Sequence, residues 1–379
     1  MARWRRKRPT NNGAPETPAD DNIEVLISRV AEPWRSSFQR SIDEMNRADP
    51  LYRPTNFWQP GVAALFRDLH QLGLEKFKSW PSSGFFFYPR YSPVFTNAMV
   101  AEVLPHLRTA APAIPDGWYN SMLVGAFEAN RDVDIALATM DDTHLRIDVA
   151  QNGESEVGSP PQRYRPFGAD GPAMGKPHLN YLKLISAVTR QLDRPPRTVL
   201  ELGAGHGALG EILLRSDPTI QYIDIDIPPL SVIANYYLAT CFPNVPFRNN
   251  LDLGPNDQFV VGEGQPSACL SSWHLPQLQG TVDLFVNAFS FQEMEPHVVS
   301  NYAREVARLG SNLVVSLNSR RGKPLSADSA VGVNEQVTSD FIADTFCDLG
   351  YRPVARLGRP AAPPQAELLI LQRVGHAPS

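Results

Sequence analysis

A glycine-rich stretch between two acidic residues is the part of this chain best suited to chemistry. An apolar run at 199–202 contains Glu201 and leads into the glycine-rich stretch 203–207, after which an amphipathic segment begins. Glycines allow a sharp turn and the close approach of a ligand, and the first N–H groups of a helix favour a negatively charged group. Asp226 ends the next apolar run, where a carboxylate can hydrogen-bond both hydroxyls of a ribose. The sequence therefore predicts a strand–loop–helix site for an adenosine-containing cofactor.

The glycine pattern fits two cofactors. Residues 205–210 read Gly-His-Gly-Ala-Leu-Gly and match the dinucleotide-binding fingerprint G-x-G-x-x-G, with Asp226 downstream. Glu201 favours the other cofactor, because the order acid-x-Gly-x-Gly-x-Gly resembles the first motif of class I S-adenosylmethionine-dependent methyltransferases. We favour the methyltransferase. An NAD(P)-dependent oxidoreductase is the first alternative, and a catalytically inactive methyltransferase fold acting as a partner protein is the second.

Apolar periodicity divides the chain into a helical part and an alternating part. It predicts helices over 22–46, 60–77, 93–107 and 118–140, the first of them split at Pro33. Residues 151–177 are rich in Gly, Pro, Ser and charge, which predicts a linker or active-site loop. After a helix over 179–192, we predict strands at 197–202, 220–226, 282–287 and 312–317 that alternate with helices at 208–215, 230–241, 296–309 and 337–349.

The C-terminal end of the chain refines the fold class. Two apolar runs at 352–357 and 367–371 are joined by a Gly/Pro-rich segment without a helix, which predicts a hairpin. Alternating β/α units closed by a hairpin favour the class I methyltransferase sheet over a plain dinucleotide domain. We predict an α/β, Rossmann-like class I methyltransferase with seven strands and a C-terminal β-hairpin, preceded by a mostly helical domain. The predicted parts are a disordered basic tail (1–21), the helical N-terminal domain (22–150), the linker (151–177) and the S-adenosylmethionine-binding domain (178–379).

Three further stretches resemble the sugar O-methyltransferase family. They are Glu-Val-Gly-Ser-Pro at 156–160, Ile-Asp-Ile-Asp-Ile-Pro-Pro at 223–229 with Asn-Tyr-Tyr-Leu at 235–238, and Asp-Leu-Phe-Val-Asn-Ala-Phe-Ser-Phe-Gln-Glu-Met at 283–294. The resemblance covers about residues 150–310 and, weakly, the tail. His206 departs from it, because the family usually carries an aromatic residue between those glycines. The resemblance implies methyl transfer to a hydroxyl of a sugar or a glycosylated natural product.

Methyl transfer to a hydroxyl needs an in-line arrangement and benefits from a general base. Glu293 follows the fourth strand, where the acceptor would meet the methyl group, and His297 comes four residues later. The catalytic candidates are Glu293, His297 and His206, with His274 and His178 as weaker ones. Glu293 has an alternative role, that of a carboxylate at a helix N-terminus. An exposed first-turn histidine is the alternative for His297.

The resemblance also implies the cofactor contacts. Glu201 would lie near the ammonium group of the methionine part, and Asp226 would bind the ribose. The predicted cofactor-binding residues are Glu201, Gly203, Ala204, Gly205, Gly207, Asp226 and Asn287. We predict no metal, because Asp283 begins its strand whereas Glu293 and Glu295 lie past its end.

Composition limits the remaining function classes. The chain has 379 residues, 42% of them hydrophobic, which is enough for a large core and two domains. Its net charge of −5 argues against nucleic acid as the main partner, and its three scattered cysteines support neither disulfides nor a zinc site. Residues 1–8 are basic, but no apolar signal region follows them and no apolar run reaches about 20 residues. We expect a cytoplasmic protein without membrane insertion that acts on a small-molecule acceptor, with a homodimer contact as an additional role of the helical domain.

An aromatic cluster at 84–89 reads Gly-Phe-Phe-Phe-Tyr-Pro and lies between two predicted helices. Core packing at the joint between these helices is the role we favour for it. One wall of the acceptor pocket is the alternative.

Overall fold

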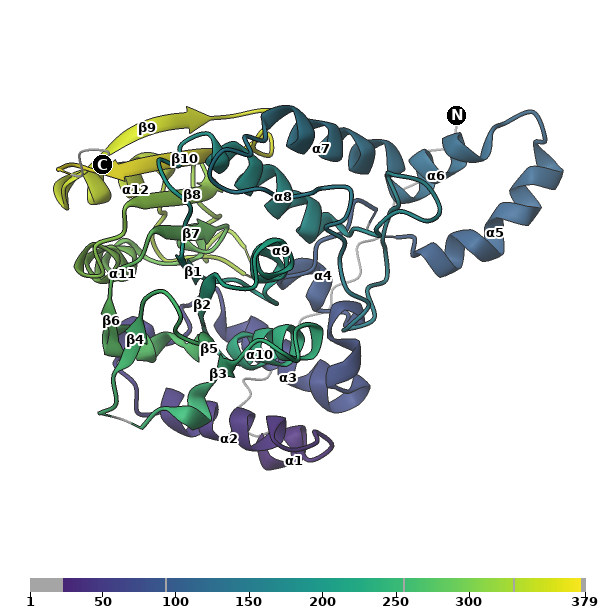
Figure 1. The fold of residues 1–379 in the computed structure, drawn as a ribbon. Helices are drawn as coiled ribbons and strands as arrows, with labels where there is room; N and C mark the ends of the chain where they lie inside the picture. Colours follow the sequence, from purple (N-terminus) through teal and green to yellow (C-terminus); the bar gives the residue numbers. More distant parts are fainter. Residues whose placement is uncertain (1–22, 93, 255, 330, 376–379) are drawn as a thin grey trace.

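One large sheet forms the centre of the molecule (Figure 1). The computed structural model describes residues 23–92, 94–254, 256–329 and 331–375, so the predicted basic tail at 1–21 lies outside the described residues. The strands of the sheet are β1 (Thr198–Leu202), β2 (Gln221–Asp226), β3 (Phe247–Arg248), β5 (Ser267–Ser271), β7 (Leu284–Ala288), β8 (Leu313–Ser319), β9 (Tyr351–Leu357) and β10 (Ala366–Arg373). Their order is β3-β5-β2-β1-β7-β8-β10-β9. β10 is antiparallel to both of its neighbours, and the other pairings are parallel.

This strand order is that of the class I methyltransferase fold, as predicted. β9 and β10 form the C-terminal hairpin, and β10 inserts between β8 and β9. The described part of the sheet has eight strands rather than the predicted seven, because β3 extends one edge. β3 has only two residues, too few to show any apolar alternation in the sequence. In the same irregular region, β4 (Phe259–Val261) and β6 (Leu278–Gly280) form a separate two-stranded sheet.

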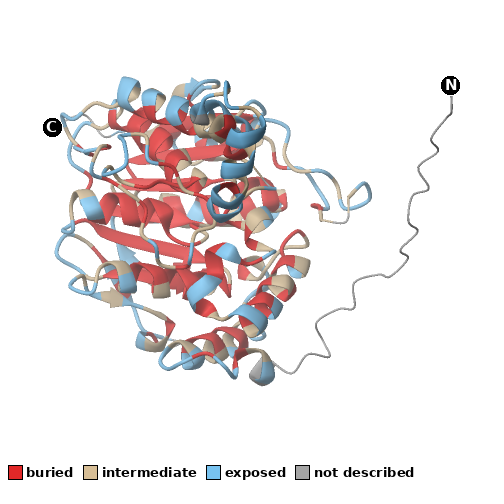
Figure 2. Ribbon diagram, turned by 90° about the vertical axis from the view of Figure 1, so that its right-hand side faces the viewer, coloured by how far each residue is buried: buried red, intermediate tan, exposed pale blue. Residues whose placement is uncertain are grey.

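Helices cover both faces of the sheet, so its six inner strands are buried almost throughout, whereas the edge strands β3 and β9 are partly exposed (Figure 2). The helices that alternate with the strands are α8 (Lys176–Thr189), α9 (Ala208–Ser216), α10 (Leu230–Cys241), α11 (Pro296–Arg308) and α12 (Ser339–Asp348). Successive side chains of β1 take opposite sides: Val199 joins the hydrophobic cluster of α8–α10, and Leu200 joins that of α11 and α12. Burial on both faces explains why these strands read as continuous apolar runs.

The segment before α8 is helical, as predicted. Its elements are α1 (Ile23–Ile27), α2 (Trp34–Met45), η2 (Pro50–Tyr52), α3 (Gln59–Leu72), η3 (Leu74–Ser79), α4 (Ser83–Phe86), α5 (Asn97–Ala110), α6 (Asp116–Val124) and α7 (Ala126–Thr139). The predicted break at Pro33 is confirmed, because α1 ends before it and α2 begins directly after it. Short 3₁₀ turns follow several strands: η4 (Asn250–Asp252), η5 (Ser272–Gln277) and η6 (Phe291–Glu293).

The helical segment packs directly on the β/α part. Phe38, Leu69 and Phe77 lie in the same hydrophobic cluster as Leu179 and Leu209, while α5 and α6 extend away from the sheet (Figure 1). The domain boundaries at residues 150 and 177 stay predictions. Within the described ranges, no helix has both the length and the apolar composition that crossing a bilayer requires.

Candidate active site

A cavity of about 330 Å³ opens at the carboxyl ends of the central strands. Its lining includes the last residues of three strands, Leu202 of β1, Asp226 of β2 and Ala288 of β7. The sheet order reverses at β1, since β2 lies on one side of it and β7 on the other. Open α/β sheets bind their ligands at such a switch point. The fold therefore places the candidate site where a nucleotide-like cofactor would bind.

The glycine loop forms one wall of this cavity. Gly203, Gly205 and Gly207 have φ values of 78°, 66° and 88°, in the left-handed region that side chains disfavour. A Cβ atom on Gly203 would lie 2.4 Å from the Ser290 hydroxyl oxygen. Of the predicted loop contacts, Gly203, Ala204 and Gly205 line the cavity and Gly207 does not.

Gly203→Ala is expected to lower the free energy of unfolding by about 2 kcal/mol or more, from left-handed strain plus the clash with Ser290. Chemical denaturation of the purified variant measures this loss. Gly262→Ala is the matched control, because a Cβ there meets no atom within 4 Å. Equal stability of the two variants would contradict the close approach at Gly203.

Asp226 lies at the cavity, and its carboxylate binds the glycine loop. Oδ2 accepts a hydrogen bond from the Gly205 N–H at 2.9 Å, and Oδ1 accepts one from the Ile227 N–H at 2.7 Å. Burial raises the pKa of Asp226 to about 7, although these two backbone hydrogen bonds lower it. The structure thus brings together the loop and the acid that the sequence paired for cofactor binding.

Glu201 is fully buried in β1 and does not line the cavity. The Tyr222 hydroxyl donates to its Oε2 at 2.5 Å. Burial raises the pKa of Glu201 to about 7, and hydrogen bonds from Tyr181 and Tyr222 act in the opposite direction. Tyr181 itself lines the cavity, so it connects the buried Glu201 to the cavity wall. Contact of Glu201 with the cofactor ammonium group stays a prediction.

Asn287 at the end of β7 is also fully buried and lies outside the cavity lining. Its amide nitrogen donates to the Leu202 carbonyl at 3.0 Å and to the Ser290 hydroxyl, and its amide oxygen accepts from Asn318 at 2.9 Å. The side chain therefore fixes the end of β1 against the turn that follows β7. This places Asn287 as a support of the site, with its side-chain groups occupied by protein partners.

Glu293 lies in the cavity, directly after β7 in η6. The Trp58 indole N–H donates to its Oε2 at 3.0 Å, and the Lys323 ammonium lies 2.9 Å from its Oε1. The Thr55 hydroxyl donates to its backbone carbonyl at 2.7 Å. Burial raises the pKa of Glu293, while Lys323 and Trp58 lower it. Glu293 is thus a carboxylate in the same cavity as the glycine loop, held by two other segments of the chain.

The histidines are placed differently from one another. His206 lines the cavity and is almost fully buried, with the rings of Tyr237 and Tyr88 centred 5.4 Å and 5.5 Å from its own. Burial, and after it the charge of Lys78, lowers the pKa of His206 well below its usual value, so the ring is neutral. His297, in contrast, is exposed in the first turn of α11 and is not part of the cavity wall.

The two weaker histidine candidates are engaged elsewhere. The His274 Nε2 atom lies 3.5 Å from the Glu44 carboxylate, and the His178 Nε2 atom lies 2.8 Å from the Asn152 carbonyl oxygen. Neither lines the cavity.

Within the described residues, no group of three or more His, Cys, Asp or Glu side chains is arranged to hold a metal ion.

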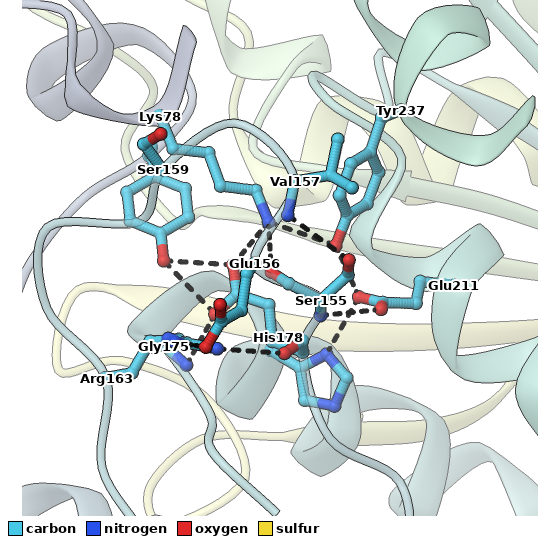
Figure 3. Close-up of polar contacts among 12 residues, drawn as sticks. Lys78, Ser155, Glu156, Val157, Ser159, Arg163, Gly175, His178, Glu211 and Tyr237 are labelled. Carbon is cyan, nitrogen blue, oxygen red and sulfur yellow. Dashed lines mark hydrogen bonds and ion pairs between the residues drawn. The ribbon is translucent and has the colours of Figure 1, made fainter. Parts of the chain in front are cut away.

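A buried polar network lies beside His206 and joins the helical segment to α9 and α10 (Figure 3). The Lys78 ammonium is fully buried, 2.8 Å from Glu154 and 3.0 Å from the Tyr237 hydroxyl. Tyr88 donates to Glu154 at 2.9 Å, and Tyr237 donates to Glu211 at 2.6 Å. This network fixes residues 154 and 155 of the loop before α8 between the two parts of the chain, because Ser155 N–H also donates to Glu211 at 2.8 Å.

The cavity wall also contains aromatic side chains and two residues, Trp58 and Lys323, that the sequence does not mark as functional. The aromatic cluster at 84–89 has both of the roles considered for it: Phe87 and Tyr88 are buried in the main hydrophobic cluster, and Phe85, Phe86, Phe87 and Pro89 line the cavity. Phe85 keeps 63% of its surface exposed, which a core residue would not do. Trp58 and Lys323 carried no local signal, because each is defined only by its contact with Glu293.

The comparisons with known proteins found only distant similarity, at low sequence identity and low TM-scores. No family model matches the chain, and no curated protein is similar to it. Among solved structures, it is similar to the mitomycin 7-O-methyltransferase MmcR (15% identity over 47% of this chain and 49% of that one, TM-score 0.33). It is likewise similar to the pyocyanin biosynthetic protein PhzM (14% identity over 52% and 59%, TM-score 0.35). A third is the magnesium protoporphyrin IX methyltransferase ChlM from Synechocystis PCC 6803 (14% over 50% and 80%, TM-score 0.35).

The aligned part spans about half the length of the first two of these proteins, 49% and 59%. The TM-scores are too low to assign the fold class. The strand order of the sheet and its antiparallel β10 assign it instead. The chain has the class I methyltransferase fold.

Proposed function

We propose that this protein transfers a methyl group from S-adenosylmethionine to a hydroxyl of a sugar or a glycosylated natural product. The observation that carries this proposal is the cavity at the switch point of the sheet, where the glycine loop, Asp226 and Glu293 meet. The donor set suits the cofactor: a carboxylate for the ribose hydroxyls, and a loop of glycines that admits a ligand to its backbone. When bound, S-adenosylmethionine supplies the methyl group on a sulfonium, an electrophile that needs no activation by the protein.

The residues of the chain have the following proposed roles. Asp226 and the glycine loop hold the cofactor, and the aromatic wall of Phe86, Phe87 and Phe289 holds the acceptor. A sugar ring presents C–H faces to such rings, while its rim of hydroxyls can reach Glu293 and amides such as Gln292 and Asn180. Glu293 takes the proton of the attacking hydroxyl as the new oxygen–carbon bond forms. Alignment of the hydroxyl with the methyl group supplies much of the rate.

The two alternatives differ in what they bind. An NAD(P)-dependent oxidoreductase would use the same glycine loop, but the inserted antiparallel β10 favours the methyltransferase. A catalytically inactive methyltransferase fold would bind the cofactor without turnover. The buried and supported Glu293 favours an active site, because an unused carboxylate at 8% exposure would carry a desolvation cost without benefit.

Calorimetric titration with S-adenosylhomocysteine, and with NAD in parallel, tests the cofactor assignment. We expect micromolar binding of S-adenosylhomocysteine, about −8 kcal/mol, and none of NAD. Asp226→Ala should weaken that binding about 10–100-fold, because hydrogen bonds to a charged group are lost. Asp348→Ala is the control, since Asp348 is exposed on α12. Binding of NAD alone would refute the proposal, and binding without methyl transfer to any acceptor would support the inactive fold.

A further inference from the structure

Glu293 is the point at which three distant segments of the chain meet. Trp58 reaches it from the start of α3, 235 residues away in sequence, and holds Oε2 at 3.0 Å. Lys323 reaches it from the loop after β8 and holds Oε1 at 2.9 Å. Both carboxylate oxygens therefore have a donor, and the side chain is confined to one orientation at the cavity. Confinement of this kind is what a positioned proton acceptor needs.

Lys323 is itself held in place by the loop that carries it. Gly322 before it turns the backbone with a φ of 77°, and the Gln336 amide donates to the Lys323 carbonyl at 2.7 Å. The Lys323 ammonium also lies 4.8 Å from the centre of the Phe57 ring, a cation–π distance. The side chain is 27% exposed, so it lines the cavity without being sealed off from it. The structure thus builds a fixed site for one positive charge next to Glu293.

Lys323 is the cation of the cavity wall that forms an ion pair with Glu293. Asp226 lines the same cavity and is close enough for the charge of Glu293 to raise its pKa. The other titratable groups of the cavity wall are Arg53, Lys176, Tyr181, His206 and Tyr302. The other two cations are hydrogen-bonded to backbone carbonyls: the Arg53 Nε–H donates to Ala48, and the Lys176 ammonium donates to Arg90. Lys323 forms the ion pair with Glu293. Burial would favour the protonated form of Glu293, which cannot accept a proton.

We propose that Lys323 is a positioning residue that keeps Glu293 ionised and directed into the cavity, ready to take the proton of the acceptor hydroxyl. This inference rests on the proposed function for the identity of the reaction, but its electrostatic part does not. In the step it serves, the acceptor oxygen forms a bond to the methyl carbon, the sulfur–carbon bond breaks, and the hydroxyl proton moves to Glu293. The positive charge on sulfur disappears as the sulfur keeps the bonding pair, and Lys323 keeps its own proton throughout.

The Trp58 indole provides a direct readout that needs no acceptor, because its N–H donates to Glu293. Two-dimensional NMR of protein carrying ¹⁵N-labelled tryptophan, with Trp58→Phe used only to assign the signal, follows this N–H through a pH titration. In the wild type, the signal should move with the ionisation of Glu293, and Glu293→Gln should abolish that movement. Lys323→Met should raise the midpoint by about 1–3 pH units, because an opposite charge in contact has been removed. Lys323→Arg should restore a midpoint close to that of the wild type.

Two further variants make the result decisive. Lys76→Met removes an exposed lysine from η3 and should leave the midpoint unchanged. Lys323→Gln replaces Lys323→Met if the methionine variant does not fold, with the same upward shift expected. An unchanged midpoint in folded Lys323→Met or Lys323→Gln would overturn the inference, since a lysine that only holds the loop in place would not alter the ionisation of Glu293. Titration with S-adenosylhomocysteine separates the two proposals: its failure in the wild type refutes the methyltransferase, whereas an unmoved midpoint refutes the role of Lys323.

Discussion

Replacing Lys78 with methionine is expected to lower the free energy of unfolding by about 3–5 kcal/mol, as removing one partner of a buried ion pair generally does. The Lys78 side chain is fully buried, and Glu154 beside it has a side-chain exposure of only 1%. Methionine has a similar volume, so the loss would come from the unpaired Glu154 carboxylate rather than from a cavity. The contact of the Lys78 ammonium with the Tyr237 ring, 4.1 Å from its centre, would be lost as well.

Urea denaturation followed by circular dichroism measures this loss. Lys76→Met is a close control, because Lys76 lies two residues earlier and is exposed; it should change stability by less than about 0.5 kcal/mol. Adding Glu154→Gln to Lys78→Met should recover part of the lost stability, since the orphaned charge then disappears. If Lys78→Met were as stable as Lys76→Met, the network in Figure 3 would not be what joins residues 154 and 155 to the helical segment.

The fold was largely predictable, because its strands and helices carry local apolar patterns. Strands buried on both faces read as unbroken apolar runs, so β1, β2, β7 and β8 were located to within one or two residues. The hairpin followed from the missing helix between β9 and β10. β3 was not predictable, since two residues contain no period, and its place at the sheet edge comes only from pairing with β5.

The site was predictable only where its residues share a local motif. The glycine loop and Asp226 mark consecutive strand ends of a parallel sheet, which must meet at one edge. His297 shows the limit of such reasoning. Helical spacing from Glu293 would put both on one face, but Glu293 ends a 3₁₀ turn and α11 begins only at Pro296. The two residues therefore lie on different elements, and the direction of one says nothing about the other.

Trp58 and Lys323 illustrate what a single sequence does not reveal. Nothing near Trp58 distinguishes it from a core tryptophan, and the loop of Lys323 has no regular pattern. Their contacts with Glu293 arise from the packing of the helical segment and of the loop after β8 over the carboxyl edge of the sheet. A functional residue defined by a distant partner becomes visible only in the folded chain.

Glu293→Gln is expected to reduce methyl transfer about 10²–10⁴-fold while leaving the affinity for S-adenosylhomocysteine unchanged. Glutamine keeps the shape of the side chain and can still accept the Trp58 hydrogen bond, but it cannot take a proton. Because burial raises the pKa of Glu293, wild-type turnover should fall on the acid side with a midpoint above the usual range of a glutamate. The direction of this pH dependence follows from the role of Glu293 as a base. Only the ionised carboxylate can take a proton, so the rate is lost as the pH falls through this pKa.

Release of S-adenosylhomocysteine in the presence of a glycoside acceptor found by screening measures the turnover of each variant. Glu335→Gln removes an exposed charge and should match the wild type at every pH. The Glu293→Gln variant should lose the acid limb of the profile altogether, because the group that titrates there has gone. A variant that kept both the wild-type rate and the acid limb would eliminate Glu293 as the base and leave His206, the histidine of the cavity wall, as the next group to replace. The neutral ring of His206 would then have to accept the proton against the nearby charge of Lys78, which makes Glu293 the stronger assignment on electrostatic grounds.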